Sequence, residues 1–110
     1  MWRLLLAVVL LGAVRSASAE YQMIGAGLLS CGSWTTNRRE DRTRVVWLSE
    51  LEWVEGFLSD VGYAGNGNGF DPLRGLGDRG VAAWLDSYCH AYPLKPLAEA
   101  AAALVDKHPH

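Results

Sequence analysis

The feature that most constrains this chain is a pair of cysteines, Cys31 and Cys89, in a sequence of 110 residues. A disulfide between them would close a loop of about 58 residues, which stabilises a fold by about 4 kcal/mol in the chain-entropy model. In a small domain, whose core alone leaves little stability to spare, that is a large fraction of the total. The alternatives are a free thiol nucleophile and a pair of metal ligands. Cys31, Cys89 and His90 lack the usual zinc spacing, and neither cysteine has a C-x-x-C partner, so we predict the disulfide.

The first 19 residues have the layout of a secretory signal peptide. Arg3 supplies the positive charge, residues 4–14 form an apolar run, and residues 17–19 form an Ala-x-Ala cleavage site. The 11 apolar residues would make about 16 Å of helix, well short of the ~30 Å hydrocarbon core, so we expect cleavage rather than a membrane anchor. Arg15 is unusual, because the segment before a cleavage site rarely carries a charge. The sequence therefore predicts a periplasmic or secreted protein, in a compartment where disulfides persist.

Removal of the leader would leave a single acidic domain, residues 20–110. It carries 8 Lys and Arg residues against 12 Asp and Glu residues, a formal net charge of −4. Nucleic-acid affinity depends on clustered cations, so we expect no nucleic-acid partner. No later stretch is apolar enough to span a bilayer, so we also expect no stable membrane insertion. One basic cluster is interleaved with acidic residues, and we interpret it as a solvated loop; it comprises Arg38, Arg39, Arg42 and Arg44.

Hydrophobic periodicity predicts two well-defined helices. In residues 44–60 the apolar residues recur at spacings of four and three, with Thr43 as the expected N-cap and the glutamates mostly off the apolar face. Residues 78–92 repeat the pattern, with Asp78 as the expected cap and Pro93 just beyond the end. The two stripes are Trp47, Leu51, Val54, Leu58 and Val61 in the first helix and Val81, Trp84, Leu85, Tyr88, Cys89 and Tyr92 in the second.

The remaining segments have weaker or opposing signals. Glycines weaken the segment 21–34, where we predict a short helix that ends near Gly32, followed by a polar connection as far as Asp41. Residues 62–77 are so rich in glycine that we predict a loop, with a turn at the Asp71-Pro72 step. Residues 97–107 are rich in alanine and predict a last helix. Because no segment alternates with a period of two, the predicted fold is all-α, a small orthogonal bundle of three to four helices with one disulfide.

No residue pattern indicates catalysis or a bound cofactor. The glycine-rich loop lacks the GK[ST] of a phosphate-binding loop, and its single G-x-G-x-D, residues 67–71, is a chance match to a calcium repeat that binds only in tandem. A Cys89–His90 nucleophile pair would need a free thiol, and His108 and His110 lie at the terminus. We therefore predict a non-enzyme with no cofactor and no metal site.

Four tryptophans make residues 20–110 rich in aromatic side chains. Trp47 and Trp84 lie on the predicted core faces, and we expect both in the core. Trp34 and Trp53 fall off the stripes. These two could mark a partner surface or could be buried by tertiary packing, and the pattern leaves both alternatives open.

The order of these segments resembles one broad group of small bacterial proteins. The residues that carry the resemblance are Ser30-Cys31, the stretch WVEGFLS at 53–59, the stretch WLDSYC at 84–89, and YPL at 92–94 before an alanine-rich helix. The group contains the HdeA-like periplasmic acid-stress chaperones and the Tai-type immunity proteins that neutralise secreted peptidoglycan amidases. The resemblance covers residues 21–106 and implies a helical, non-enzymatic protein. The single possible disulfide favours the chaperone-like pattern.

Two functions follow as expectations, both with another protein as the partner. In the first, the protein is an HdeA-like acid-stress chaperone. With its carboxylates protonated, residues 20–110 would carry about +12, and this self-repulsion would loosen the bundle while the disulfide limits expansion. In the second, the protein is an immunity or inhibitor protein that binds a secreted cell-wall hydrolase through loop 62–77 or an acidic helix face.

Overall fold

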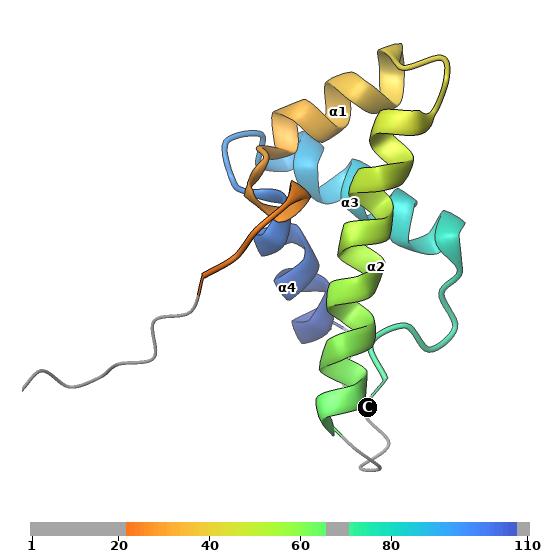
Figure 1. Ribbon diagram of the computed structural model, residues 1–110, viewed down its shortest axis with the longest axis vertical. Coiled ribbons are helices and arrows are strands. Elements are labelled where there is room, and N and C mark those ends of the chain that lie inside the picture. Colours follow the sequence, from red (N-terminus) through yellow and green to blue (C-terminus); the bar gives the residue numbers. More distant parts are fainter. Residues whose placement is uncertain (1–21, 66–70, 108–110) are drawn as a thin grey trace, which may run out of the picture.

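The computed structural model describes residues 22–65 and 71–107, and every regular element in these two ranges is a helix (Figure 1). They form a compact all-helical globule, which confirms the predicted fold class. Several segments singled out in the sequence lie outside the described residues. They are the predicted leader at 1–19, residues 67–70 of the calcium-like repeat, and His108 and His110. The elements are the 3-10 helix η2 (Ala26–Leu28) and the α-helices α1 (Cys31–Glu40), α2 (Val45–Gly65), α3 (Asp78–Ala91) and α4 (Leu97–Lys107).

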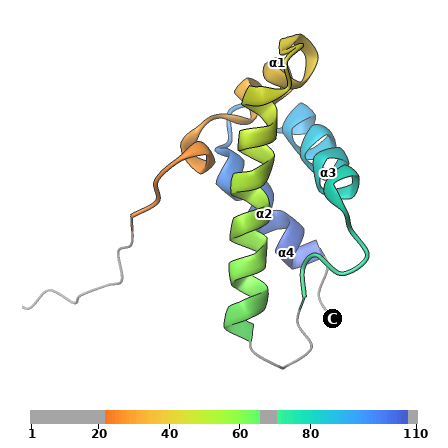
Figure 2. The same cartoon turned by 45° about the vertical axis from the view of Figure 1, so that its right-hand side comes forward.

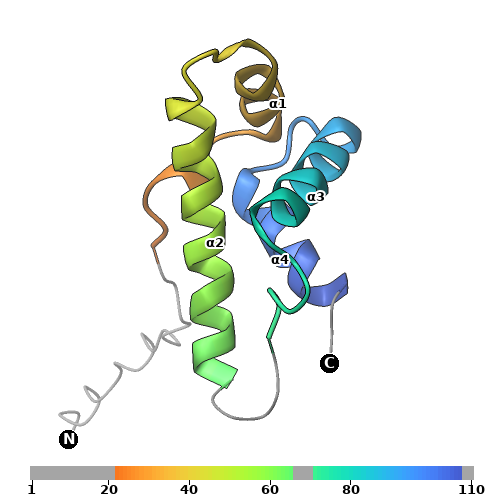
Figure 3. The ribbon, with the colours of Figure 1, turned by 90° about the vertical axis from the view of Figure 1, so that its right-hand side faces the viewer.

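The long helix α2 forms one side of the globule, and α3 and α4 lie against it on the same side (Figure 3). Helix α1 crosses near the N-terminal end of α2, and η2 lies on the opposite side of α2 from α3 (Figure 2). The apolar faces of the four helices meet in a single core. Its fully buried members include Cys31, Trp34, Val54, Leu58, Val81, Leu85, Cys89, Leu97, Ala101 and Leu104.

Helix α2 confirms the periodic prediction and extends beyond it. Leu51, Val54 and Leu58 are buried as expected. The Oγ1 atom of Thr43 accepts a hydrogen bond from Val45 N at 3.2 Å, but α2 begins at Val45, so Thr43 lies one residue before the N-cap position predicted for it. Asp41 adds a second cap, because its carboxylate accepts from Val46 N at 2.7 Å.

The prediction that the glutamates lie off the apolar face was wrong for Glu50. Its side chain is only 1% exposed, because α1 covers this side of α2. The Nδ2 atom of Asn37 in α1 donates to Glu50 Oε1 at 3.1 Å. A single-helix pattern cannot show this, because the neighbour that buries Glu50 comes from a different helix.

The predicted short helix and polar connection between residues 21 and 41 were wrong in their boundaries. Only Ala26–Leu28 is helical before Ser30, and α1 then includes most of the expected connection. The Oγ atom of Ser30 accepts from Ser33 N at 3.1 Å and so caps α1. The helix buries only Cys31 and Trp34, which is too sparse a stripe to be recognised as a helical period.

The predicted loop 62–77 was wrong at its N-terminal end, where residues 62–65 continue α2. Residues 66–70 lie outside the described part of the chain. The turn at Asp71-Pro72 is confirmed: Asp71 Oδ1 accepts from Leu73 N at 3.0 Å, and Pro72 is buried. Asp78 is the first residue of α3 rather than its cap, since Gly77 occupies the N-cap position without a side-chain bond.

The helices α3 and α4 follow their predicted stripes closely. Val81, Leu85 and Cys89 are fully buried, but Tyr92, predicted to lie on the apolar face, is half exposed because α3 ends at Ala91. The structure contains the disulfide between Cys31 and Cys89, with 4.7 Å between the two Cα atoms. Two backbone hydrogen bonds reinforce the same connection. Cys31 N donates to Lys95 O at 2.8 Å, and Leu97 N donates to Leu29 O at 2.8 Å.

Candidate functional site

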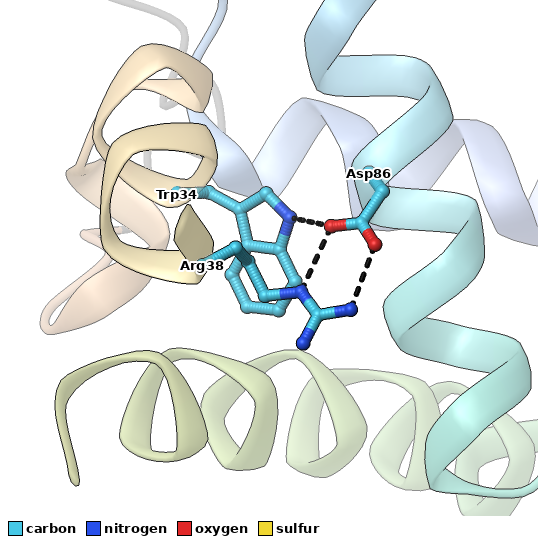
Figure 4. A network of polar contacts seen from close by, with 3 residues as sticks. All are labelled: Trp34, Arg38 and Asp86. Carbon is cyan, nitrogen blue, oxygen red and sulfur yellow. Dashed lines mark hydrogen bonds and ion pairs between the residues drawn. The ribbon is translucent and has the colours of Figure 1, made fainter. Parts of the chain in front are cut away.

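The most strongly connected polar group joins α1 to α3 one turn beyond the disulfide, and we name it the α1–α3 latch (Trp34, Arg38 and Asp86). Arg38 donates to both carboxylate oxygens of Asp86, from Nε at 2.9 Å and from one terminal nitrogen at 2.8 Å (Figure 4). Trp34 Nε1 donates to the Oδ1 atom of Asp86 at 2.9 Å. One carboxylate therefore accepts three hydrogen bonds from two side chains that are four residues apart on α1.

Aromatic rings enclose the cation of the latch. The Cζ atom of Arg38 lies 4.5 Å from the ring centroid of Trp47 in α2 and 5.5 Å from that of Trp34. Trp34 is fully buried, and its ring meets Trp47 edge-on with 6.3 Å between centroids. Each cation–π contact contributes about 1 kcal/mol when the cation is partly desolvated. The latch thus connects three helices, because Trp47 brings α2 into contact with a pair formed by α1 and α3.

The latch sets the charge states of its members. Partial burial would raise the pKa of Asp86, but the hydrogen bonds from Arg38 and Trp34 outweigh burial and hold this pKa below its ordinary value of 3.8. The hydrogen bond to Asp86 raises the pKa of Arg38. Side-chain exposures of 30% for Arg38 and 41% for Asp86 limit the ion pair to about 1 kcal/mol of stability. Its stabilisation is present at neutral pH and is lost as the pH falls through the lowered pKa of Asp86.

Two carboxyl groups on α2 have the opposite shift. Burial raises the pKa of Glu50, and the hydrogen bond from Asn37 only partly offsets it. The second oxygen of Glu50, Oε2, is buried without a hydrogen-bond partner among the described residues. Burial also raises the pKa of Glu55. A hydrogen bond with Asp78 and the negative charges of Asp78 and Glu52 act in the same direction, and together they raise this pKa to about 7. Acidification below neutral pH therefore protonates Glu55 in the folded protein.

A groove of about 490 Å³ lies between α2 and α3, on the α2 side of the latch. We name it the α2–α3 groove. Its apolar lining comes from Trp47, Leu48 and Leu51 of α2 and from Ala82 and Ala83 of α3. Leu48 is 40% exposed and Ala83 is exposed, so the groove is open to solvent. Its volume lies within the range of about 300–1,000 Å³ that binding sites occupy.

The charged side chains of the α2–α3 groove are mostly arginines. Arg38 and Asp86 neutralise each other in the latch. The other charged lining residues are two arginines, Arg44 and Arg79, and one aspartate, Asp78. Within residues 22–65 and 71–107, neither Arg44 nor Arg79 forms an ion pair. Arg44 also has a φ angle of 67°, in the left-handed region that residues other than glycine and asparagine seldom adopt. The groove is thus positive in a domain whose overall charge is negative.

On the other side of the latch, a polar depression of about 360 Å³ is lined by Thr35, Arg39 and His90 beside Arg38 and Asp86. His90, the histidine that follows Cys89, is exposed there, and the cysteine that it would need as a nucleophile is in the disulfide. No three His, Cys, Asp or Glu side chains converge on a possible metal position in the part of the chain that the structure describes.

Sequence reasoning found the two cysteines but missed the latch. The expectation that Arg38 lies in a solvated loop was wrong, because Arg38 is part of α1 and faces α3. Trp34, whose burial had been left open, is in the core, and Trp53 is partly buried beside Gly27. A usable signal existed, since Trp34 and Arg38 are four residues apart and would share a face if the segment were helical.

No protein-family model matches this chain, and the comparisons found neither a curated protein nor a solved structure similar to it. The fold and the site therefore define the class directly: a compact all-helical globule of four helices in its described part, linked by the Cys31–Cys89 disulfide. None of its described helices has the length and apolar character needed to cross a membrane. The disulfide is consistent with an oxidising compartment outside the cytoplasm.

Proposed function

We propose that this protein is a non-enzymatic, extracytoplasmic, acid-stress chaperone-like domain that binds unfolding client proteins at low pH. The observation that carries the proposal is the α1–α3 latch. Among the described residues, Asp86 accepts the hydrogen bond of Trp34 Nε1 and is the only anionic partner of Arg38. Its protonation removes the ion pair between α1 and α3 without removing any positive charge.

Loss of the latch coincides with a large change in net charge. Residues 20–110 go from −4 at neutral pH to about +12 when all carboxyl groups are protonated. The repulsion favours expansion at the moment when the ion pair disappears. Because the disulfide does not titrate, α1 and α3 stay tethered at Cys31 and Cys89 while apolar core surface becomes accessible to a client.

The test uses residues 20–110 with the disulfide intact. At pH 2–3 the protein is expected to expose apolar surface and to reduce the light scattering of an aggregating client enzyme, and at pH 7 it is expected to do neither. The variant Asp86→Asn should show activity at a higher pH than the wild type, whereas the exposed Asp106→Asn should behave as the wild type does. A protein that neither opens nor suppresses aggregation near pH 2–3 would contradict the proposal.

The α2–α3 groove favours a second candidate, an immunity or inhibitor protein that binds a secreted cell-wall hydrolase in its folded state. The two candidates differ in pH dependence, because the groove is present at neutral pH and client capture requires acid. Inhibition of a peptidoglycan amidase at pH 7 by the native, disulfide-bonded protein would support this second function. Unchanged amidase activity with a molar excess of the protein would remove it.

A further inference from the structure

The proposed acid response gives no role to the α2–α3 groove. The α2–α3 groove combines apolar lining, two arginines that form no ion pair with another described residue, and a backbone position in the left-handed region. All three belong to the folded state at neutral pH. We propose that the α2–α3 groove is a docking site for an acidic amphipathic helix of a partner protein.

The lining of the groove suits the apolar face of a helix. On α2 the apolar contact surface comes from the exposed Leu48 and the partly buried Trp47, whereas Leu51 of the same wall is only 2% exposed. Ala82 and Ala83 on α3 have small side chains, so a third backbone can approach the opposite wall closely. An amphipathic helix that lies between two such walls buries residues at spacings of three and four, the usual pattern of helix-in-groove recognition.

The charges of the groove select the partner. Arg44 is at the N-terminal end of α2, and Arg79 is in the first turn of α3, so the two walls each carry one exposed guanidinium. A guanidinium is planar and rigid, and it can bind a carboxylate through two parallel hydrogen bonds. Among the described residues that line the groove, Asp78 is the one acidic side chain outside the Arg38–Asp86 pair. The complementary ligand therefore has carboxylates on both sides of its apolar face.

The position of Arg44 adds an independent argument. Its φ of 67° is the only positive value for a residue other than glycine among the described residues. Such a conformation is unfavourable for a residue with a side chain and persists where the surrounding structure imposes it. Here it occurs at the residue between the Asp41 cap and α2, and Arg44 is also one of the residues that line the groove.

This docking site does not depend on the acid response. At pH 2–3 the carboxylates of a partner helix would be protonated and the latch beside the groove would be open. Docking is therefore expected at neutral pH, and it can fail or succeed whether or not the protein acts as a chaperone in acid.

The experiment titrates residues 20–110 at pH 7 with three fluorescently labelled amphipathic peptides of about 15 residues. The peptides share one leucine face and differ only in the flanking residues, which are Glu, Gln or Lys. Fluorescence anisotropy gives the affinities. The Glu peptide is expected to bind about tenfold more tightly than the Gln peptide and to bind more weakly as salt is added. The Lys peptide is expected not to bind.

Variants locate the binding site. Arg44→Asn with Arg79→Gln should weaken binding of the Glu peptide about tenfold, since asparagine tolerates a positive φ and glutamine is a good helix former. Leu48→Ser should weaken binding of both the Glu and the Gln peptides. Arg74→Gln, an exposed arginine in the turn before α3, is the matched control and should leave binding unchanged. Circular dichroism at pH 7 verifies that each variant keeps the helical content of the wild type.

Four results would overturn the proposal. They are equal affinity for the Glu and Gln peptides, wild-type affinity in the arginine double variant, binding of dodecanoate or anionic vesicles without binding of the Glu peptide, and a wild-type dimer that Leu48→Ser dissociates. The last result would assign the groove to a second copy of this chain.

Discussion

Asp86 and Glu55 are both partly buried carboxyl groups, and they titrate in opposite directions because their neighbours differ. Asp86 accepts from Arg38 and Trp34, which together outweigh its desolvation and lower its pKa. Burial raises the pKa of Glu55, and Asp78 and Glu52 raise it further, to about 7. Stability must therefore rise as Glu55 takes up its proton and fall as Asp86 takes up its own.

Glu55→Gln tests the first half of this statement. A raised pKa in the folded state means that the wild type gains stability as the pH falls from 8 towards 5. We expect a gain of about 1 kcal/mol in the free energy of unfolding by urea, because solvent contact reduces the effect. The Gln variant should show no such gain and should be the more stable protein at pH 8. Asp60→Asn, an exposed carboxylate on the same helix, should retain the wild-type slope; equal slopes in Glu55→Gln and the wild type would refute the assignment.

Among the elements, those with a continuous apolar stripe could be predicted from sequence, and the polar helix α1 could not. Helices α2, α3 and α4 each bury a stripe at spacings of three and four, so their positions were predictable to within a few residues. Helix α1 buries only Cys31 and Trp34, and its stability comes from the Ser30 cap and from contacts to α3. The Arg38–Asp86 pair was missed for the same reason, because its two members meet only after α1 and α3 have packed.

The α2–α3 groove was also beyond sequence reasoning. Its arginines come from positions 44 and 79, far apart in sequence, and each looks like an ordinary surface charge by itself. The glycine content of residues 62–77 led to a predicted end of α2 that is too early, because residues 62–65 remain helical despite Gly62 and Gly65. Local propensity was outweighed there by continuation of an already formed helix.

The contact between η2 and α2 supplies a prediction for the N-terminal element. A Cβ at Gly27 would overlap the six-membered ring of Trp53, whose Nε1 atom donates to Ile24 O at 2.9 Å. Gly27→Ala should therefore displace the ring and destabilise the protein by about 1–3 kcal/mol, measured by urea unfolding. Gly56→Ala is the matched control, because nothing lies within 4 Å of its Cβ and alanine favours a helix interior. The hypothesis fails if both variants are stabilised.

The disulfide predicts the order in which elements are lost. Cys89→Ser should cost about 4 kcal/mol or less in stability, depending on how well the Lys95 and Leu29 backbone bonds hold the junction. Hydrogen exchange should show earliest loss of protection in residues 22–34, while residues 45–60 of α2 keep theirs longest. Simultaneous loss in both segments would show that α1 and α2 unfold as one unit and would contradict this order.

At the scale of the whole molecule, neutral and acidic conditions favour different states of one chain. Near neutral pH the latch is closed, the groove is formed and residues 20–110 carry a charge of −4. Mild acidification first protonates Glu55 and strengthens the fold. Strong acid then removes the Asp86 charge and leaves a large positive excess. The account therefore predicts maximum stability in mildly acidic solution and opening only below the ordinary aspartate range.

The most direct test of this account is an acid titration of residues 20–110 by binding of a dye that reports exposed apolar surface, with the disulfide intact. The wild type and Asp106→Asn should expose apolar surface only below about pH 3.8, the ordinary pKa of an aspartate. Asp86→Asn should do so at a midpoint about half a pH unit higher or more, because its latch is already weakened at neutral pH. Identical midpoints for Asp86→Asn and the wild type would contradict the claim that the α1–α3 latch sets the acid response.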